Sequence, residues 1–470
     1  MNPLIVIANR EPYVHQNSSC AHEALRPASG LVTALEPILR ASGGLWVAHG
    51  SGAFDPLTVD AKGEIAVPPH DPTYRLRRLF LTPQEEAGYY SGFSNEGLWP
   101  LCHLAHNRPV FRLSDWQQYK TVNFKFSSAL RRTDLQQNPL ILVQDYHFAL
   151  VPRILKEIHL ETQLQVGLFW HIPWPNPEIF GICPWAKELL SGLLGADLIG
   201  FHTQAYCNNF LATCDRYLEA RVDWEHFSVH RENHSTSVRA FPIGIQPEPV
   251  TDLSPLEISK LKKKYGIHCD LLAVGVDRLD YTKGIPERVE AVERFLEKYP
   301  AYQGRFALVQ IAAPSRSHLP AYQSLEQHLK QLIQRVNERF RSSDGKYQPI
   351  YFLNEHFNWD QLQQFYQLGD LCLVTSLHDG MNLVAKEYVW CQKPHQGALI
   401  LSQFTGACQE LTEAWIVNPY SPEQVADAMA HALRMPHQER SQRMQSMKQK
   451  VQNQSALHWG QQMVSALKKT

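Results

Sequence analysis

Four basic residues stand at or just beyond the ends of short apolar segments of this 470-residue chain. The chain has a net charge of −1, so these cations do not reflect a general basic excess. A guanidinium group binds phosphate through two parallel hydrogen bonds, and an ammonium group acts as a point charge, so the set suits a ligand that carries phosphate. The alternative is that each cation pairs with a nearby carboxylate, for example Arg278 with Asp277 or Asp280. The four residues are Arg10, Arg278, Lys283 and Arg316.

Two glycine-containing loops add features of a nucleotide site. Gly284 precedes Ile285-Pro286-Glu287, which is typical of a helix start, where unpaired backbone amides bind anions. The stretch 380–387 also reads as a loop entering a helix. Its amides suit a diphosphate, and the carboxylate of Glu387 suits the two hydroxyls of a ribose.

The apolar segments in front of these residues predict buried strands. They are short and lack polar alternation, as do strands of a parallel sheet covered on both faces. Ligands of open parallel sheets bind beyond the carboxyl ends of the strands, which is where the polar residues stand. The predicted strands are 4–8, 140–143, 164–169, 198–201, 271–276, 307–311 and 371–375.

Longer amphipathic stretches between the strands predict helices and therefore an α/β doubly wound fold. Ser254-Pro255 and Ser421-Pro422 are typical helix starts, with a capping serine and a proline in the first turn. The length suits two domains. The prolines within 241–252 mark the expected boundary, after a polar stretch, 231–237, that we expect to be a surface loop.

Composition argues against several classes of function. A nucleic-acid-binding protein is expected to be basic, and a bilayer-spanning helix needs about 18 apolar residues in a row, which the chain lacks. The nine cysteines are scattered, which favours reduced thiols in a cytoplasmic protein. His103 and His106 have metal-ligand spacing but no evident third ligand, so we expect no metal. The missing Gly-x-Gly-x-x-Gly fingerprint disfavours a dinucleotide oxidoreductase.

Several long motifs occur along the chain: Tyr89-Tyr90 with Phe93-Ser94-Asn95, Leu98-Trp99-Pro100, Asp145-Tyr146-His147, His171-Ile172-Pro173, Arg278-Leu279-Asp280-Tyr281 with Lys283-Gly284, and the stretch from Asp379 to Tyr388. With these motifs the chain resembles the trehalose-6-phosphate synthases, retaining glucosyltransferases that use a nucleotide sugar. The resemblance extends over nearly the whole length. It implies the GT-B architecture, in which two Rossmann-like domains face each other across a deep cleft.

The resemblance also implies how the chain is divided. An N-terminal acceptor-binding domain would comprise residues 1–240, joined by a C-terminal helix of about 455–470. A C-terminal donor-binding domain would comprise residues 241–454.

For the donor, the resemblance implies that Arg278 and Lys283 hold the diphosphate and that Glu387 takes the ribose hydroxyls. Asp379, with backbone amides of the loop that follows it, would hold the transferred glucose, and His171 would contact the donor sugar. The implied catalytic residues are Arg278, Lys283, Asp379 and His171. The implied donor-binding residues are Gly30, Arg278, Lys283, Met381, Asn382, Leu383, Val384 and Glu387.

For the acceptor, the resemblance implies that Asp145 contacts sugar hydroxyls and that four residues bind the phosphate and shape the site: Arg10, Tyr90, Trp99 and Arg316. The chain departs from the family pattern in the first loop, 11–25, in the donor loop Ala28-Ser29-Gly30-Leu31, and at Ser376 and His378. These departures concern the donor base and the acceptor more than the type of reaction.

The implied reaction transfers glucose from a nucleotide-glucose, preferably UDP-glucose, to glucose 6-phosphate and gives α,α-trehalose 6-phosphate. A retaining glycosidase uses two carboxylates about 5 Å apart. The motifs contain no such pair, so we expect a same-face displacement in which the leaving phosphate takes the acceptor proton. No cofactor and no metal are expected, because the nucleotide sugar is itself a substrate.

Alternatives remain within and beyond this class. Within it are a glucosylglycerol-phosphate synthase, another sugar- or polyol-phosphate glycosyltransferase, and a transferase with a pseudo-sugar donor. Beyond it is a non-catalytic homologue that only binds sugar phosphate. The donor base, UDP, GDP or ADP, stays open. The expected partners are the donor and the acceptor, without nucleic acid or membrane, and a homo-oligomer is compatible with the sequence.

Overall fold

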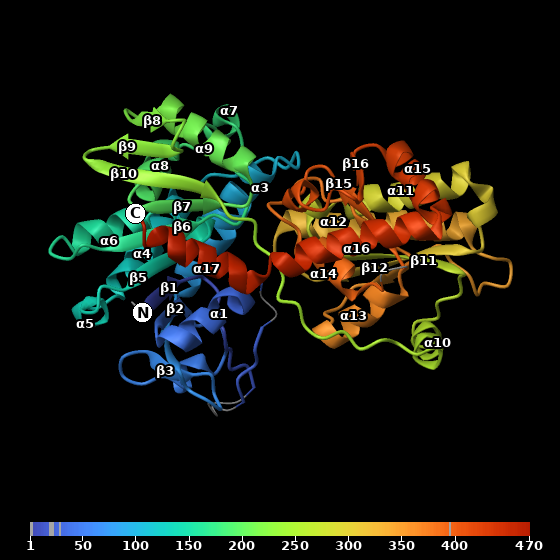
Figure 1. Cartoon of the computed structure of the whole chain (residues 1–470), viewed down its shortest axis with the longest axis horizontal. Coiled ribbons are helices and arrows are strands. Elements are labelled where there is room, and N and C mark those ends of the chain that lie inside the picture. The colour runs from blue at the N-terminus through green and yellow to red at the C-terminus, as the bar shows by residue number, and fades with distance from the viewer. Residues whose placement is uncertain (1–2, 18–22, 28–29, 394–395) are drawn as a thin grey trace. The chain divides into compact units, whose positions relative to one another are not determined.

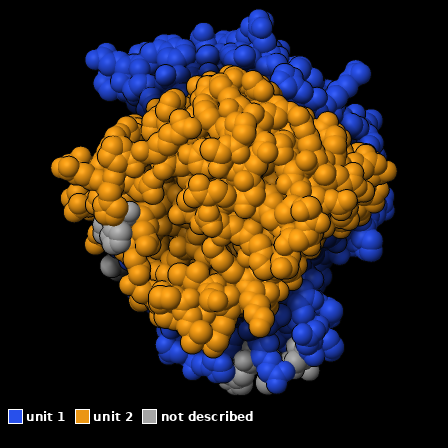
Figure 2. Space-filling view, turned by 90° about the vertical axis from the view of Figure 1, so that its right-hand side faces the viewer, with its two compact units in different colours: residues 1–246, 456–470 blue, residues 247–455 orange. Residues whose placement is uncertain are grey.

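The computed structural model describes residues 3–17, 23–27, 30–393 and 396–470 (Figure 1). The chain forms two compact units, coloured separately in Figure 2. Unit 1 comprises residues 1–246 and 456–470, and unit 2 comprises residues 247–455. Each unit is built around one largely parallel sheet with helices, which confirms the predicted α/β doubly wound class.

The sheet of unit 1 has the strand order β3-β4-β2-β1-β5-β6-β7-β10-β9-β8. The strands from β4 to β10 in this order run parallel, while β3, β9 and β8 pair antiparallel to their neighbours. The strands are β1 (Leu4–Ile7), β2 (Leu45–His49), β3 (Glu64–Val67), β4 (Tyr74–Leu79), β5 (Leu140–Gln144), β6 (Gln165–Phe169), β7 (Leu198–Phe201), β8 (Arg221–Asp223), β9 (Ser228–Arg231) and β10 (His234–Ala240).

The polar stretch 231–237 is not a loop, so this expectation was wrong. It forms the turn of an antiparallel hairpin and the start of β10. Glu232 and Asn233 have φ angles of 52° and 64°, the geometry of a two-residue hairpin turn that matches the twist of its strands. Strands at a sheet margin expose one face to solvent and therefore carry polar residues.

The helices of unit 1 connect these strands, and the last helix of the chain also belongs to this unit. Helix α17 packs beside α1 (Figure 1). Gly460 permits this approach, because a Cβ there would stand 2.7 Å from the side chain of Ile38. The helical segments are α1 (Gly30–Ser42), η2 (Asp55–Leu57), α2 (Pro83–Glu86), η3 (Ala87–Leu98), α3 (Trp99–His103), α4 (Leu113–Ser128), α5 (Arg132–Leu135), η4 (Tyr146–Phe148), α6 (Val151–Ile158), α7 (Pro177–Phe180), α8 (Ala186–Leu193), α9 (Gln204–Tyr217) and α17 (Ala456–Leu467).

The sheet of unit 2 is entirely parallel, with the order β13-β12-β11-β14-β15-β16. Its strands are β11 (Leu271–Arg278), β12 (Phe306–Ala313), β13 (Ile350–Leu353), β14 (Leu371–Val374), β15 (Ala398–Ser402) and β16 (Trp415–Val417). Its helical segments are α10 (Pro255–Lys264), η5 (Tyr281–Lys283), α11 (Ile285–Lys298), η6 (Pro300–Tyr302), α12 (Pro320–Phe340), α13 (Trp359–Leu368), α14 (Leu383–Cys391), η7 (Gly406–Gln409), α15 (Pro422–Arg434) and α16 (His437–Asn453).

All seven predicted strands are strands of the structure, with ends that differ by at most two residues. The predicted helix starts are also confirmed. Ser254 caps α10 through a reciprocal pair of hydrogen bonds with Glu257, and the Ser421 side chain accepts a bond from the Gln424 amide at the start of α15.

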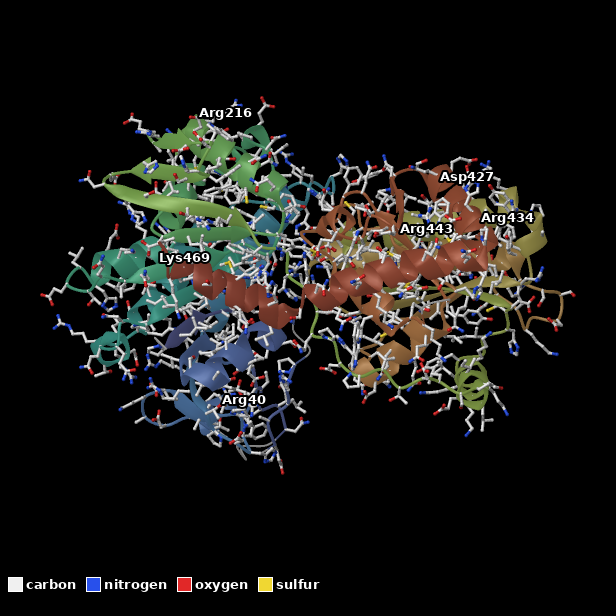
Figure 3. All side chains as sticks on the ribbon, in the orientation of Figure 1. Arg40, Arg216, Asp427, Arg434, Arg443 and Lys469 are labelled. Atoms are coloured by element: carbon white, nitrogen blue, oxygen red, sulfur yellow. The ribbon has the colours of Figure 1, made fainter. Side chains whose placement is uncertain are left out.

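Many charged side chains lie on the outside of the units, where they pair locally (Figure 3). Arg40 pairs with Asp71 at 3.2 Å, and the guanidinium of Arg434 lies 5.1 Å from the ring centre of Tyr299. Across the described part of the chain, no helix is both long and apolar enough to cross a membrane.

Candidate functional site

Two loops of unit 2 bring Lys283 and Asp379 together. Lys283 ends η5, just after β11, and Asp379 follows β14, which pairs with β11 in parallel. The Lys283 Nζ donates to Asp379 Oδ2 at 2.5 Å, and the two side chains are only 13% and 14% exposed. The carboxyl edge of this sheet therefore holds a mostly buried ion pair.

The Asp379 carboxylate is held by its own loop as well. Its Oδ2 accepts hydrogen bonds from Asn382 Nδ2 at 3.1 Å and from the Ser376 hydroxyl at 3.4 Å. Asn382 has a φ of 90°, and its Oδ1 accepts a bond from the Ala385 amide, which caps α14. Ser376, a departure from the family pattern, thus contributes a hydrogen bond to this loop.

Helix α14 begins directly behind this ion pair. Its first backbone amides have no partner within the helix and carry partial positive charge, so Leu383 and Val384 present an anion-binding end. Further along, the Tyr366 hydroxyl donates to Glu387 Oε2 at 2.8 Å. Burial raises the pKa of Glu387, and the Tyr366 bond offsets part of that rise.

Asp280 interacts with the three predicted basic residues of unit 2, which are Arg278, Lys283 and Arg316. The Arg316 Nη1 donates to Asp280 Oδ2 at 3.3 Å and to the Tyr322 hydroxyl at 2.6 Å. Burial alone would raise the pKa of Asp280, but the positive charges of Arg316, Arg278 and Lys283 hold it below its usual value. Arg316 therefore contacts Asp280 directly, and Arg278 and Lys283 act on it through their charges.

The alternative for the basic residues was that they pair with carboxylates. Lys283 pairs with Asp379, and Arg316 pairs with Asp280. Of the two partners suggested for Arg278, Asp277 bonds to the fully buried Arg288, whereas Asp280 interacts with the charge of Arg278. Arg288 also donates to Gln310 and Thr375, so it joins the ends of β11, β12 and β14 beneath the loops. A Cβ at position 275 would lie 2.5 Å from Arg288 Nη1, so a glycine there makes room for the guanidinium.

In unit 1, a π-helix carries two of the motif tyrosines. Such helices are rare and occur often at functional sites. In η3, the Tyr89 hydroxyl donates to Asn9 Oδ1 at 3.1 Å, which links the segment to the residue before Arg10. The Tyr90 ring stacks on His147 with centroids 5.6 Å apart.

Arg10 and Trp99 are two further predicted residues of unit 1. Arg10 is exposed after β1, and its carbonyl accepts a bond from Trp46 Nε1 at 3.0 Å. The buried ring of Trp99, at the start of α3, lies 6.0 Å from that of Tyr146.

Asp145 and His171 meet at the ends of β5 and β6. Asp145 Oδ1 accepts bonds from the backbone amides of Tyr146 at 2.9 Å and of His171 at 3.1 Å. The His171 Nε2 lies 2.9 Å from Gln144 Oε1. Burial lowers the pKa of His171 well below its usual value, and His202 and His147 add to this. His171 is therefore neutral, and the amide oxygen of Gln144 assigns the ring proton to Nε2.

The structure brings the predicted residues into two groups, one in each unit. Unit 1 holds Gly30, the first residue of α1, with Arg10, Tyr90, Trp99, Asp145 and His171, and unit 2 holds Arg278, Lys283, Arg316, Asp379, Met381, Asn382, Leu383, Val384 and Glu387. Ala28 and Ser29 of the donor loop lie outside the described residues. Within the described ranges, no group of three or more His, Cys, Asp or Glu residues is arranged to hold a metal ion.

Three polar residues that support these groups were not predicted. Gln144, Tyr366 and Asp280 each bond to a predicted residue. Asp280 stands within the motif Arg278-Leu279-Asp280-Tyr281, and Gln144 directly precedes the motif Asp145-Tyr146-His147. These places were the available signal. Tyr366 lies far from Glu387 in sequence, and no local pattern indicates that contact.

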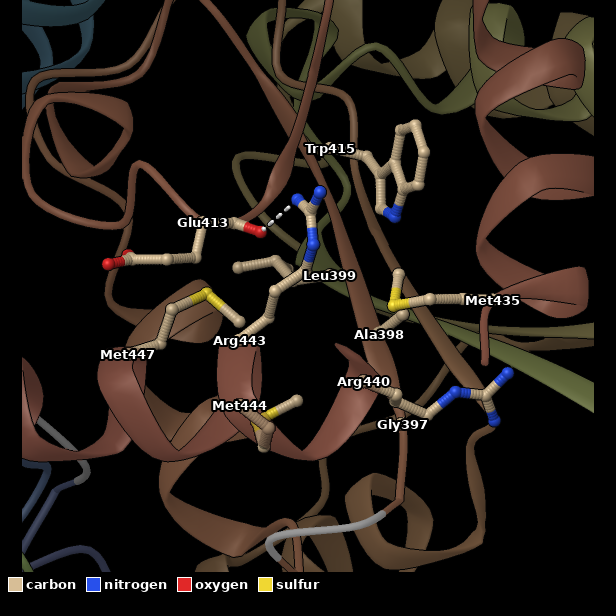
Figure 4. A pocket seen from close by; sticks show the side chains of 10 residues that line it. All are labelled: Gly397, Ala398, Leu399, Glu413, Trp415, Met435, Arg440, Arg443, Met444 and Met447. Carbon is tan, nitrogen blue, oxygen red and sulfur yellow. Dashed lines mark hydrogen bonds between the residues drawn. The ribbon is translucent and has the colours of Figure 1, made fainter. Parts of the chain in front are cut away.

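A small pocket of about 10 Å³ in unit 2 is separate from these residues (Figure 4). The Arg443 guanidinium lies 5.2 Å from the ring centre of Trp415 and donates to the Glu413 carbonyl. Predicted site residues are not among its lining, which consists of Gly397, Ala398, Leu399, Glu413, Trp415, Met435, Arg440, Arg443, Met444 and Met447.

Comparisons with known proteins agree with the motifs. The sequence profile of glycosyltransferase family 20 matches residues 2–469. An α,α-trehalose-phosphate synthase (UDP-forming) of Schizosaccharomyces pombe is 34% identical over 475 residues, which cover 99% of this chain and 90% of the relative. A solved E. coli structure bound with UDP-2-fluoro glucose has a TM-score of 0.87 at 33% identity, covering 100% of this chain and 99% of that one.

A second solved structure is an α,α-trehalose-phosphate synthase (UDP-forming) from Burkholderia xenovorans in complex with glucose 6-phosphate. It has a TM-score of 0.86 at 30% identity and covers 99% of this chain and 100% of that one. The predicted resemblance and the GT-B fold are thereby confirmed. This chain belongs to glycosyltransferase family 20, the family of the trehalose-6-phosphate synthases.

Proposed function

We propose that this enzyme transfers glucose from UDP-glucose to glucose 6-phosphate and releases α,α-trehalose 6-phosphate and UDP. The relatives support each part of this reaction, since one is UDP-forming, one holds a UDP-glucose analogue and one holds glucose 6-phosphate. The observation that carries the proposal is the Lys283–Asp379 pair at the N-terminus of α14. A cation and a helix N-terminus side by side suit a diphosphate.

Unit 2 would hold the donor. Arg278 and Lys283 would neutralise the diphosphate, together with the backbone amides at the start of α14. An ammonium group has three donors, so Lys283 retains capacity for phosphate oxygens while it bonds to Asp379. Glu387, oriented by the Tyr366 hydroxyl, would accept hydrogen bonds from the ribose.

The acceptor would be recognised mainly by cations and aromatic rings. Arg10 and Arg316 would bind its phosphate, Tyr90 and Trp99 would shape the site, and Asp145 would accept bonds from its hydroxyls. In unit 1, His171 would contact the donor sugar as a neutral imidazole, because its pKa is low.

Transfer would retain the configuration of the glucosyl carbon without a metal. The bond from that carbon to the diphosphate oxygen breaks on the same face on which the acceptor oxygen bonds. The leaving phosphate takes the acceptor proton. Arg278 and Lys283 would stabilise the negative charge that develops on the diphosphate.

Asp379 suits a positioning role better than a nucleophilic one, since its Oδ2 is engaged by Lys283, Asn382 and Ser376. Isolation of a covalent glucosyl-enzyme would contradict this mechanism.

The test is an assay of purified enzyme with UDP-glucose or GDP-glucose against glucose 6-phosphate or glycerol 3-phosphate. The proposal expects the highest kcat/KM for the pair of UDP-glucose and glucose 6-phosphate. A preference for glycerol 3-phosphate would identify a glucosylglycerol-phosphate synthase instead. Binding of sugar phosphate without nucleotide release would identify a non-catalytic homologue.

A further inference from the structure

Four ionisable side chains form a buried cluster in unit 1, close to Arg10. They come from the segment after β1, from η2 and from β4, and all are at most 2% exposed. We call Glu11, His15, Asp55 and Arg78 the Arg78 cluster. The proposed reaction gives none of them a role.

Arg78 joins the cluster through all three of its guanidinium nitrogens. Its Nε donates to Glu11 Oε2 at 2.7 Å, and its Nη2 lies 3.1 Å from Asp55 Oδ1. Nη2 also donates to the Tyr13 carbonyl at 2.7 Å, and Nη1 donates to Thr58 Oγ1 at 2.6 Å. One side chain of β4 therefore holds both the segment after β1 and the segment around η2.

Backbone amides complete the same connection. The Ser51 amide donates to Glu11 Oε1 at 3.0 Å, and the His15 amide donates to Asp55 Oδ1 at 2.8 Å. A Cβ at Gly52 would lie 2.5 Å from the His15 carbonyl oxygen, so this close approach requires a glycine. Glu11 and His15 are thus fixed at both ends of a five-residue segment.

Such a cluster is not an efficient way to stabilise the folded state. Buried ion pairs lose much hydration energy, and apolar residues of similar volume often stabilise a protein as well or better. Its position offers another explanation. On the C-terminal side of the exposed Arg10, its carbonyl accepts a bond from Trp46, and the next residue, Glu11, is held by Arg78. On the N-terminal side, Asn9 Oδ1 accepts a bond from the Tyr89 hydroxyl.

We propose that the Arg78 cluster positions Arg10 for the acceptor phosphate, with Glu11 and Arg78 as the positioning residues. This inference rests on the proposed function, which assigns the acceptor phosphate to Arg10. Holding the backbone around Arg10 reduces the conformational entropy lost when the sugar phosphate binds.

The two buried carboxylates of the cluster, Glu11 and Asp55, share one guanidinium group, which favours a proton on one of them. Burial and the neighbouring Asp55 raise the pKa of Glu11 to about 8, although Arg78 opposes this. Arg78 from β4 and Asp55 from η2 act on Glu11, and His15, from the same segment as Glu11, contacts both of these residues. Loss of the proton at alkaline pH adds an uncompensated buried charge and loosens the segment.

Arg77 provides a matched control. It neighbours Arg78 on β4 and is equally buried, but it points to the opposite face, where it bonds to Glu64 and Asp134. Arg77→Met removes a comparable ion network without touching the segment that carries Arg10.

Steady-state kinetics of the full-length enzyme test the proposal. Arg78→Met and Glu11→Ala should raise the KM for glucose 6-phosphate by about ten-fold or more, with the KM for UDP-glucose changed by less than about two-fold. Arg77→Met should lower the Tm but change neither KM by more than about two-fold. The acceptor KM of the unmodified enzyme should rise above pH 8, where Glu11 loses its proton, and Glu11→Gln, whose side chain stays neutral, should remove this rise.

The inference would be overturned if Arg77→Met and Arg78→Met had similar KM values for glucose 6-phosphate. If Arg78→Met does not fold, the kinetics of Glu11→Ala provide the test, because this variant leaves the Arg78–Asp55 pair intact.

Amide hydrogen exchange separates this inference from the proposed function. Exchange at Tyr13, Val14 and His15 should accelerate by about ten-fold in Glu11→Ala and not in Arg77→Met, whatever the enzyme transfers. Unchanged exchange at these amides would overturn the positioning role even in an enzyme that makes trehalose 6-phosphate.

Discussion

The Lys283 ammonium group lies 2.5 Å from the Asp379 carboxylate, although the two residues come from different strand-end loops. The pair sits where β11 and β14 end side by side, in front of helix α14. The carboxylate fixes the direction of the ammonium group, and the helix supplies amides of the same polarity. A diphosphate bound here would contact the Lys283 ammonium group and the α14 amides, and these groups would need little rearrangement to bind it.

Replacing Lys283 with alanine should lower kcat by about 100-fold or more, because a preorganised charge that stabilises the leaving group is lost. The measurement is UDP release at saturating concentrations of both substrates. Lys298→Ala is the control, since Lys298 also pairs with carboxylates, Glu423 and Asp427, but belongs to a surface network. Equal kcat values for the Lys283 variant and the unmodified enzyme would reject the diphosphate role.

Arg316→Ala should raise the KM for glucose 6-phosphate by about ten-fold and also lower the Tm. The second effect arises because Asp280, which is fully buried, loses its charged partner. Tyr322→Phe is the control: it removes the hydroxyl that bonds to Arg316 but leaves the guanidinium in place. A lower Tm with an unchanged KM would show that Arg316 serves only the structure around Asp280.

The seven predicted strands were recognisable because burial on both faces makes them continuous apolar runs. Two further buried apolar strands, β2 and β15, were not predicted. The strand β4 was missed, since Arg75, Arg77 and Arg78 make it look like a solvated segment. Two of these arginines are buried in ion networks whose carboxylates come from distant parts of the chain. Local patterns contain no information on such partners, so a strand of this kind cannot be recognised from its own residues.

For the candidate site as well, some features could be predicted from the sequence and others could not. The rule that ligands bind beyond strand ends, together with the motifs, indicated which residues bear chemistry. It did not indicate which of them bond to one another. The Lys283–Asp379 and Tyr366–Glu387 contacts join loops or helices far apart in sequence, and the Arg78 cluster depends on three separate segments.

The pKa of Glu11 predicts how stability depends on pH. The folded state holds a proton on Glu11 up to about pH 8, whereas the unfolded chain releases it near its ordinary pKa of 4.5. The stabilisation is therefore complete below pH 4.5 and is lost as pH rises toward 8.

Glu11→Gln lacks this proton and isolates the effect from other titrating groups. The free energy of unfolding of the unmodified enzyme, minus that of Glu11→Gln, should fall by about 3 to 4 kcal/mol between about pH 5 and pH 8. Urea unfolding at intermediate pH values measures it. A difference that stays constant over this range would show that Glu11 is ionised in the folded state.

Tyr366→Phe should weaken donor binding without altering the chemical step. The variant loses the hydroxyl that fixes Glu387, so the carboxylate meets the ribose in a less ordered state, and the KM for UDP-glucose should rise by about three- to ten-fold. The kcat and the KM for glucose 6-phosphate should change little. Tyr388→Phe is the matched control, because Tyr388 lies on the same helix as Glu387 and its hydroxyl bonds to the Gly369 carbonyl instead. If both variants raise the donor KM equally, the effect comes from packing around α14. If Tyr366→Phe alone raises it, the hydroxyl acts through Glu387, which ties that carboxylate to the nucleotide.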